Sequence, residues 1–97
     1  MIKLSYPDPW LRELVAEQCE KVAHSAPGWR RYQLFRAAVI LGHHAHKGEL
    51  SRAVVEGWLE HAAGSSGLIL CHGVELVEKT IRAGLDHGAI ETQWGFL

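Results

Sequence analysis

The chain has 97 residues, of which 47% are hydrophobic and 22% are charged, and its formal net charge is −1. This length suits one small domain with one modest core, so we expect residues 1–97 to form a single domain. The net charge gives no support for nucleic-acid binding. The charge is nevertheless uneven, because seven basic and four acidic residues lie up to Lys47, against three basic and seven acidic residues from Glu49 onward. A basic face can therefore exist that the net charge hides.

The N-terminal sequence MIKLSYPDPW has no apolar segment typical of a signal peptide, and the longest aliphatic run, AAVIL, is too short to cross a bilayer. The two cysteines, Cys19 and Cys71, do not suggest a disulfide framework. We therefore expect a cytoplasmic protein that has reduced thiols and no contact with membranes.

The first helix is expected to begin at Asp8 and Pro9, because aspartate caps helices and proline suits the first helical position. Apolar residues then recur at steps of three and four, which is typical of one buried helix face. These residues are Leu11, Val15, Cys19, Val22 and Ala26. The tripeptide APG, residues 26–28, is expected to end the helix.

A second helix is expected from about Trp29 to Lys47, with Gly48 as the glycine that ends it. Gly42 lies inside this helix, where glycine costs about 1 kcal/mol relative to alanine. Close approach of another helix would explain it.

A third helix is expected to begin at the N-cap Ser51 and to end at GSSG, residues 64–67. We expect its Trp58 and Leu59 to be largely buried together with Leu41 and Ile81.

A fourth helix is expected from about Val74 to His87, with Gly88 as its stop. The apolar tail, residues 89–97, is expected to pack on the bundle or to join two copies in a homo-oligomer through Trp94, Phe96 and Leu97. Together these patterns predict an all-α protein: a compact bundle of four short helices, or five, without a sheet.

Seven histidines raise the question of a metal site. His43 and His46 could share one helix face, and Cys71 and His72 could complete a site, but no CxxC, HxxxH or HExxH spacing is present. Most of the histidines instead fall near the ends of predicted helices, where they complement the free carbonyl groups. These are His24, His43, His44, His46, His61 and His87. We therefore predict no metal and no cofactor.

Motifs for nucleophilic catalysis are also missing. The sequence contains no GxSxG, and Ser65 and Ser66 lie in a glycine-flanked segment where serine favours a turn. Both cysteines fall in apolar stretches, and a buried cysteine usually acts as a small hydrophobic residue. We predict that the protein is not an enzyme.

The segment GWRRYQLFR concentrates basic and aromatic side chains in two helical turns. These are Trp29, Arg30, Arg31, Tyr32 and Arg36. Proteins that bind single-stranded nucleic acid combine cationic groups for the backbone with rings for the bases. The alternative is a solvated helix start whose arginine stems cover Trp29 or Tyr32. The residues alone favour this alternative, because short basic clusters are common.

The stretch from Gly28 to Gly88 resembles a small helical domain that follows the catalytic part of bifunctional primase–polymerases of phages, plasmids and integrated elements. The matching positions are Gly28, Arg30, Leu34, Ala37, Ala38, Leu41, Gly42, Gly48, Leu50, Ala62, Ala63, Gly67, Leu68, Thr80, Ile81, Gly84, Leu85 and Gly88. Arg31 stands where the family has asparagine, Ala83 where it has serine, and Ile69–Gly73 looks like an insertion. No primase or helicase motif accompanies the domain. The resemblance therefore implies a mobile-element origin and a role near nucleic acid, without polymerase activity.

Two functions remain open at this point. In the first, a non-catalytic module binds single-stranded nucleic acid or a nucleoprotein complex through Trp29, Arg30, Arg31, Tyr32 and Arg36. In the second, a phage-encoded protein inhibitor of the anti-CRISPR kind binds a host nucleoprotein complex by protein–protein contacts. The acidic second half of the chain weakly favours the second function.

Overall fold

The computed structural model describes residues 9–93, with side chains up to Ile90. The elements in chain order are α1 (Pro9–Ala23), a 3-10 turn η2 (Pro27–Trp29), α2 (Arg30–His46), α3 (Arg52–Ser66), α4 (Leu68–His72) and α5 (Val74–Gln93). Residues 9–93 contain no strand. The predicted all-α bundle is confirmed, and α4 is its fifth helix.

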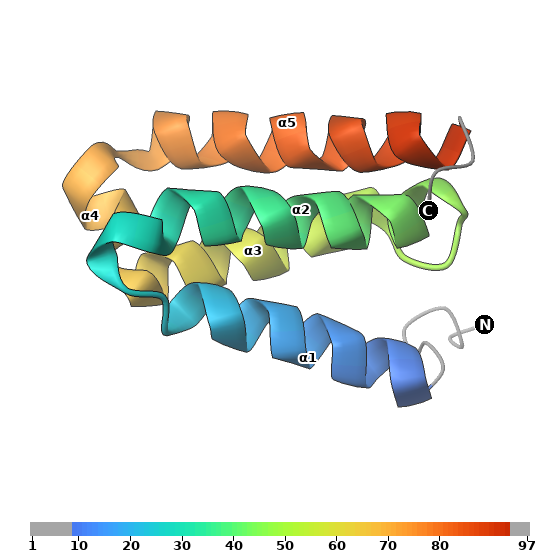
Figure 1. The fold of residues 1–97 in the computed structure, drawn as a ribbon, viewed down its shortest axis with the longest axis horizontal. Helices are drawn as coiled ribbons and strands as arrows, with labels where there is room; N and C mark the ends of the chain where they lie inside the picture. The colour runs from blue at the N-terminus through green and yellow to red at the C-terminus, as the bar shows by residue number, and fades with distance from the viewer. Residues whose placement is uncertain (1–8, 94–97) are drawn as a thin grey trace.

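The helices form a bundle in which α2 and α5 lie side by side and run in the same direction (Figure 1). Helices α1 and α3 run the opposite way. The outer helix α1 packs against α2 and α3, and the short helix α4 lies at the end of the bundle where α2 begins. This arrangement brings the start of α2 close to the turn between α3 and α4.

One hydrophobic core receives side chains from all five helices. Its largest fully buried members are Val22, Leu34, Leu41, Val55, Leu59, Leu68, Val77 and Leu85. The predicted burial of Leu59, Leu41 and Ile81 is confirmed. The predicted burial of Trp58 is wrong, because its side chain is 38% exposed. Val55, Leu59 and Ala62 define the inward face of α3, and Trp58 lies beside that face, over a groove between α1 and α3.

Glycines allow α2 and α5 to approach closely. A Cβ atom on Gly42 would lie 2.7 Å from the backbone oxygen of Leu85, which confirms the predicted close approach. A Cβ atom on Gly84 would collide with Ala38, and one on Gly88 would collide with the backbone of Val39. Gly88 is therefore a contact residue inside α5, and the prediction that it ends the helix is wrong.

The predicted N-cap of α3 is confirmed, since the Ser51 hydroxyl accepts a hydrogen bond from the Val54 amide at 3.4 Å. The other end of α3 differs from the prediction, because the helix continues through the GSSG segment as far as Ser66 and only Gly67 leaves it, at φ 90°. The Ser66 hydroxyl donates to the Ala63 carbonyl and accepts from the Leu68 amide. Most of the expected insertion belongs to α4, whose first residue, Leu68, is buried in the core.

Two further expectations concern the C-terminal tail and the absence of a membrane span. Trp94, Phe96 and Leu97 lie outside the described residues, so the homo-oligomer contact through the C-terminal tail stays a prediction. Within residues 9–93, no helix combines the length and the apolar character that crossing a bilayer requires.

Candidate nucleic-acid interface

The start of α2 presents an exposed pair of aromatic rings. Trp29 is 61% exposed and Tyr32 is 52% exposed, although both are large side chains. Their rings meet edge to face, with centroids 5.8 Å apart. Arg31 and Arg36 are exposed on the same two turns of the chain. Four of the five residues predicted to form a binding site therefore lie together on the surface.

Arg30 has different surroundings from the other four. Its guanidinium group lies against Gly67, 3.7 Å from the place where a Cβ atom on that glycine would be. Its NH1 group donates to the Cys71 sulfur at 3.7 Å, and its Nε atom is buried without a hydrogen-bond partner among the described residues. Arg30 thus connects the start of α2 to the turn between α3 and α4, and we expect its main role to be structural.

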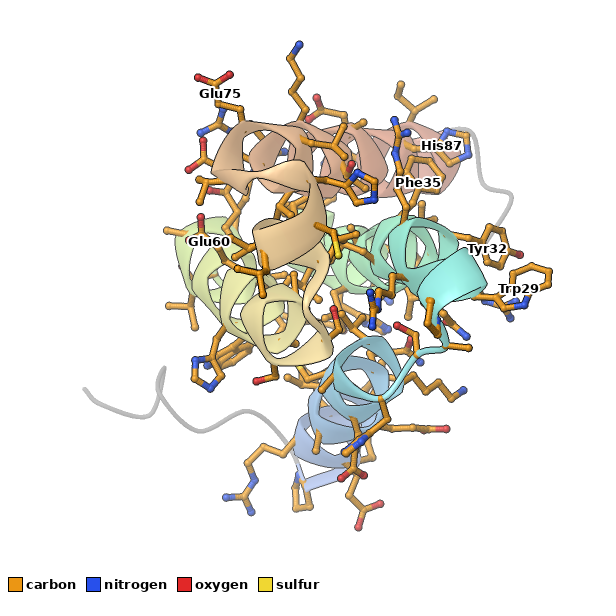
Figure 2. The ribbon with its side chains drawn as sticks, turned by 90° about the vertical axis from the view of Figure 1, so that its left-hand side faces the viewer. Trp29, Tyr32, Phe35, Glu60, Glu75 and His87 are labelled. Carbon is orange, nitrogen blue, oxygen red and sulfur yellow. The ribbon has the colours of Figure 1, made fainter. Side chains whose placement is uncertain are left out.

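Two further rings extend the aromatic pair along the same side of the molecule. The Phe35 ring, one turn beyond Tyr32, lies 5.9 Å from the ring of His87 on α5. Figure 2 shows Trp29, Tyr32, Phe35 and His87 along one side of the bundle, and we call these four residues the aromatic edge. The regular spacing of three from Trp29 to Phe35 is a signal in the sequence that indicates this edge. The predicted position of His87 at a helix end is wrong, because α5 continues for six residues beyond it.

A groove between α2 and α5 runs beside the aromatic edge. Its lining residues are Gly28, Arg31, Tyr32, Phe35, Leu76, Lys79, Thr80 and Ala83. Among the described residues that line it, only Arg31 and Lys79 are charged, and both are cationic. Lys79 and Thr80 are not among the residues predicted from the sequence, because nothing local in the sequence indicates which helix packs beside α2.

The side of the molecule between α3 and α5 has the opposite charge. Glu56, Glu60 and Glu78 surround a small hollow there, together with Arg82. In Figure 2, Glu60 and Glu75 lie on the side opposite Trp29 and Tyr32. Two of these glutamates form ion pairs, Glu56 with Arg52 and Glu78 with Arg82, but glutamates outnumber arginines around the hollow. The charged side chains lining the α2–α5 groove are instead all cationic, which favours an anion on that side.

The structure separates the side chains that could have formed a metal site. His43 and His46 lie near the end of α2, whereas Cys71 and His72 lie on α4 at the other end of the bundle (Figure 1). Within the described part of the chain, no group of three or more histidine, cysteine, aspartate or glutamate side chains is arranged to hold a metal ion. His44 interacts with a carboxylate, since its Nδ1 atom lies 2.6 Å from Glu49 Oε1.

The two cysteines are free thiols in different environments. Cys19 is half-buried, and burial raises the pKa of its thiol, which disfavours the reactive thiolate. Cys71 is exposed at the end of α4, so the expectation of apolar surroundings is wrong for this residue. Its apolar neighbour Leu70 is also exposed, because Leu68 alone turns fully into the core.

Comparison with family models, with curated proteins and with solved structures found no match to the chain. The resemblance of Gly28–Gly88 to the primase-associated domain stays a prediction.

Proposed function

We propose that this protein is a non-catalytic helical module that binds single-stranded nucleic acid, free or within a nucleoprotein complex, through the start of α2. The observation that carries the proposal is the exposed Trp29–Tyr32 ring pair beside exposed Arg31 and Arg36. The resemblance to the primase-associated domain adds a mobile-element origin to the same proposal, and the sequence-based expectation of a cytoplasmic protein belongs to it as well.

The chemistry of this surface suits an unpaired strand better than a duplex. The bases of a single strand can stack on aromatic side chains, and each stacked base contributes about 1–3 kcal/mol irrespective of its identity. Arginine side chains bind the phosphates and make the affinity dependent on salt. The acidic side between α3 and α5 repels the same strand, so the aromatic edge is the favoured contact.

Fluorescence anisotropy of a labelled 12-residue oligothymidylate at low salt tests the proposal. We expect the wild-type protein to bind. The double variant Trp29→Ala, Tyr32→Ala should lose roughly 5- to 150-fold in affinity for each stacked base, because the stacking surface is gone. Arg31→Glu should also flatten the plot of log affinity against log salt by about 0.7 units for each lost phosphate contact. The same measurement with oligouridylate compares DNA with RNA.

Arg12→Glu is the matched control for the charge reversal, because Arg12 is exposed on α1, away from the groove between α2 and α5. It changes the net charge as much as Arg31→Glu does. We expect its salt dependence to stay close to that of the wild type. Equal losses in both variants would mean that only overall charge matters, and absence of binding by the wild type would overturn the proposal.

The acidic side favours the second candidate function, a protein inhibitor of a host nucleoprotein complex. Glu56, Glu60 and Glu78 could face a basic groove on such a partner. In that case a variant with Glu60→Lys and Glu78→Lys should lose inhibition of a nucleoprotein complex, while Arg31→Glu retains it. The first candidate function predicts the reverse, with loss of binding in Arg31→Glu and retention of binding in the variant with Glu60→Lys and Glu78→Lys.

A further inference from the structure

The groove between α2 and α5 differs from the other hollows of the molecule in the chemistry of its walls. The groove between α1 and α3 has Glu20 as its charged residue, and the charged residues of the hollow between α3 and α5 are three glutamates and Arg82. The α2–α5 groove instead has cationic Arg31 on one wall and cationic Lys79 on the other. Its volume, about 760 Å³, lies within the range of small-molecule sites.

The walls between these two cations suit a flat ring. Phe35 and Leu76 provide apolar surface from the two helices, and the small side chain of Ala83 leaves space between them. The Thr80 hydroxyl donates to the Leu76 carbonyl at 2.8 Å, so its remaining lone pairs can accept a hydrogen bond.

Two rings of the groove lining meet further rings outside it. His87 lies one helical turn beyond Ala83 on α5, and its ring lies 5.9 Å from that of Phe35. The ring of Tyr32 meets that of Trp29 edge to face. Figure 2 shows all four rings on the same side of the bundle.

We propose that the α2–α5 groove binds one nucleotide of the strand, with the phosphate between Arg31 and Lys79 and the base against Phe35, Leu76 and Ala83. This inference rests on the proposed function and names the subsite next to the aromatic pair. The bases of the neighbouring nucleotides would stack on Tyr32 and Trp29, whose rings are exposed at the start of α2.

Two substitutions separate the two parts of this subsite. Ala83→Leu fills the space for the base with an apolar side chain that favours helix, so the fold should be retained. Lys79→Gln removes the positive charge that would bind the phosphate and keeps an unbranched polar side chain, slightly shorter than that of lysine. The matched control for the first variant is Ala53→Leu, because Ala53 is an exposed alanine on α3 that lines none of these three hollows.

The probe is the labelled 12-residue oligothymidylate, titrated at several salt concentrations. Ala83→Leu should lower its affinity roughly 5- to 150-fold without changing the salt slope, because only stacking is lost. Lys79→Gln should flatten the slope by about 0.7 units. Ala53→Leu should match the wild type in both measurements.

The outcomes distinguish this inference from the function on which it rests. Suppose that both groove variants keep the affinity and the salt slope of the wild type, while the double variant Trp29→Ala, Tyr32→Ala binds more weakly. This result would overturn the groove subsite and keep the proposed function. Absence of binding by the wild-type protein would overturn both. Loss of binding in Ala53→Leu as well as in Ala83→Leu would mean that the added leucine acts through the fold, which also counts against the subsite.

Discussion

Arg30 and Arg31 are neighbours in the chain, yet their side chains have different surroundings. Arg31 is exposed and lines the α2–α5 groove, whereas Arg30 lies against Gly67 and Cys71. The aliphatic stem of a half-buried arginine contributes packing as well as charge. We therefore expect the same substitution to lower the stability of the fold at Arg30 and to leave it almost unchanged at Arg31.

Arg30→Glu should lower the free energy of unfolding by about 1–3 kcal/mol, because it places a carboxylate in the contact between α2 and the α3–α4 turn. Arg31→Glu should change the free energy of unfolding by less than about 0.5 kcal/mol, as is usual at exposed positions. Urea denaturation of both variants measures the difference. Equal stability of the two variants would contradict the structural role of Arg30.

Glu49 connects the end of α2 to the turn before α3. Its Oε1 atom lies 2.6 Å from His44 Nδ1, and its Oε2 atom lies 3.7 Å from the Lys47 ammonium group. The hydrogen bond from His44, followed by the charge of Lys47, holds the pKa of the Glu49 carboxyl below its ordinary value. A carboxyl with a lower pKa in the folded state stabilises the fold above its unfolded pKa, and this stabilisation is lost as the pH falls through the folded pKa.

Glu49→Gln should therefore be less stable than the wild type near about pH 6, and the difference should shrink as the pH falls below the ordinary glutamate pKa of about 4.3. Urea denaturation from about pH 6 to about pH 3 measures this trend. Glu13→Gln is the control, since Glu13 is exposed on α1. A difference for Glu49→Gln that does not vary with pH would exclude the carboxylate as its cause.

At the scale of the helices, glycine has two opposite roles in this protein. Gly57 is exposed on α3, and a Cβ atom there would meet nothing within 4 Å. A Cβ atom on Gly88 would collide with the backbone of Val39. The same substitution by alanine should therefore have opposite effects at the two positions.

Gly57→Ala should raise the free energy of unfolding by about 0.5–1 kcal/mol, because alanine restricts the unfolded chain and favours helix. Gly88→Ala should lower it by about 1–3 kcal/mol, because α2 and α5 must move apart. Urea denaturation of the two variants measures both effects. Stabilisation by Gly88→Ala would mean that the close contact of the two helices does not persist in solution.

The positions that carry the resemblance to the primase-associated domain are mostly packing and turn positions. Gly42, Gly84 and Gly88 lie at the α2–α5 contact, and Gly48 and Gly67 have φ values of 84° and 90°. The matching leucines and alanines are buried. The pattern therefore describes how the helices pack, and Trp29, Tyr32 and Phe35 on the exposed edge are outside it.

At the scale of the whole molecule, the helices differ in how tightly they are held. The backbones of α2 and α5 touch at their glycines. The outer helix α1 is separated from α3 by a groove of about 450 Å³, with Cys19 and Trp58 among its lining residues. Sparse packing lowers the free energy of local opening.

Native-state hydrogen exchange should therefore find the amides of α2 and α5 the most protected. The amides of α1 should exchange through an opening that costs roughly 1–3 kcal/mol less than global unfolding. Mass spectrometry of peptides from each helix measures this order. Equal protection of α1 and α5 would show that the bundle opens only as one cooperative unit.

The sequence alone determined the helices and most of their buried faces, because a step of three or four residues depends only on the local helical period. Ser51 and Gly42 were interpreted correctly for similar reasons, since a cap uses neighbouring residues and a glycine inside a helix indicates a close contact. The helix that makes this contact became known only from the tertiary structure. The role of Gly88, the half-burial of Arg30, the exposure of Trp58 and the position of Lys79 opposite Arg31 all depend on side chains that are distant in the chain. Local patterns do not contain that information, because the neighbours of each helix are chosen by how the whole core packs.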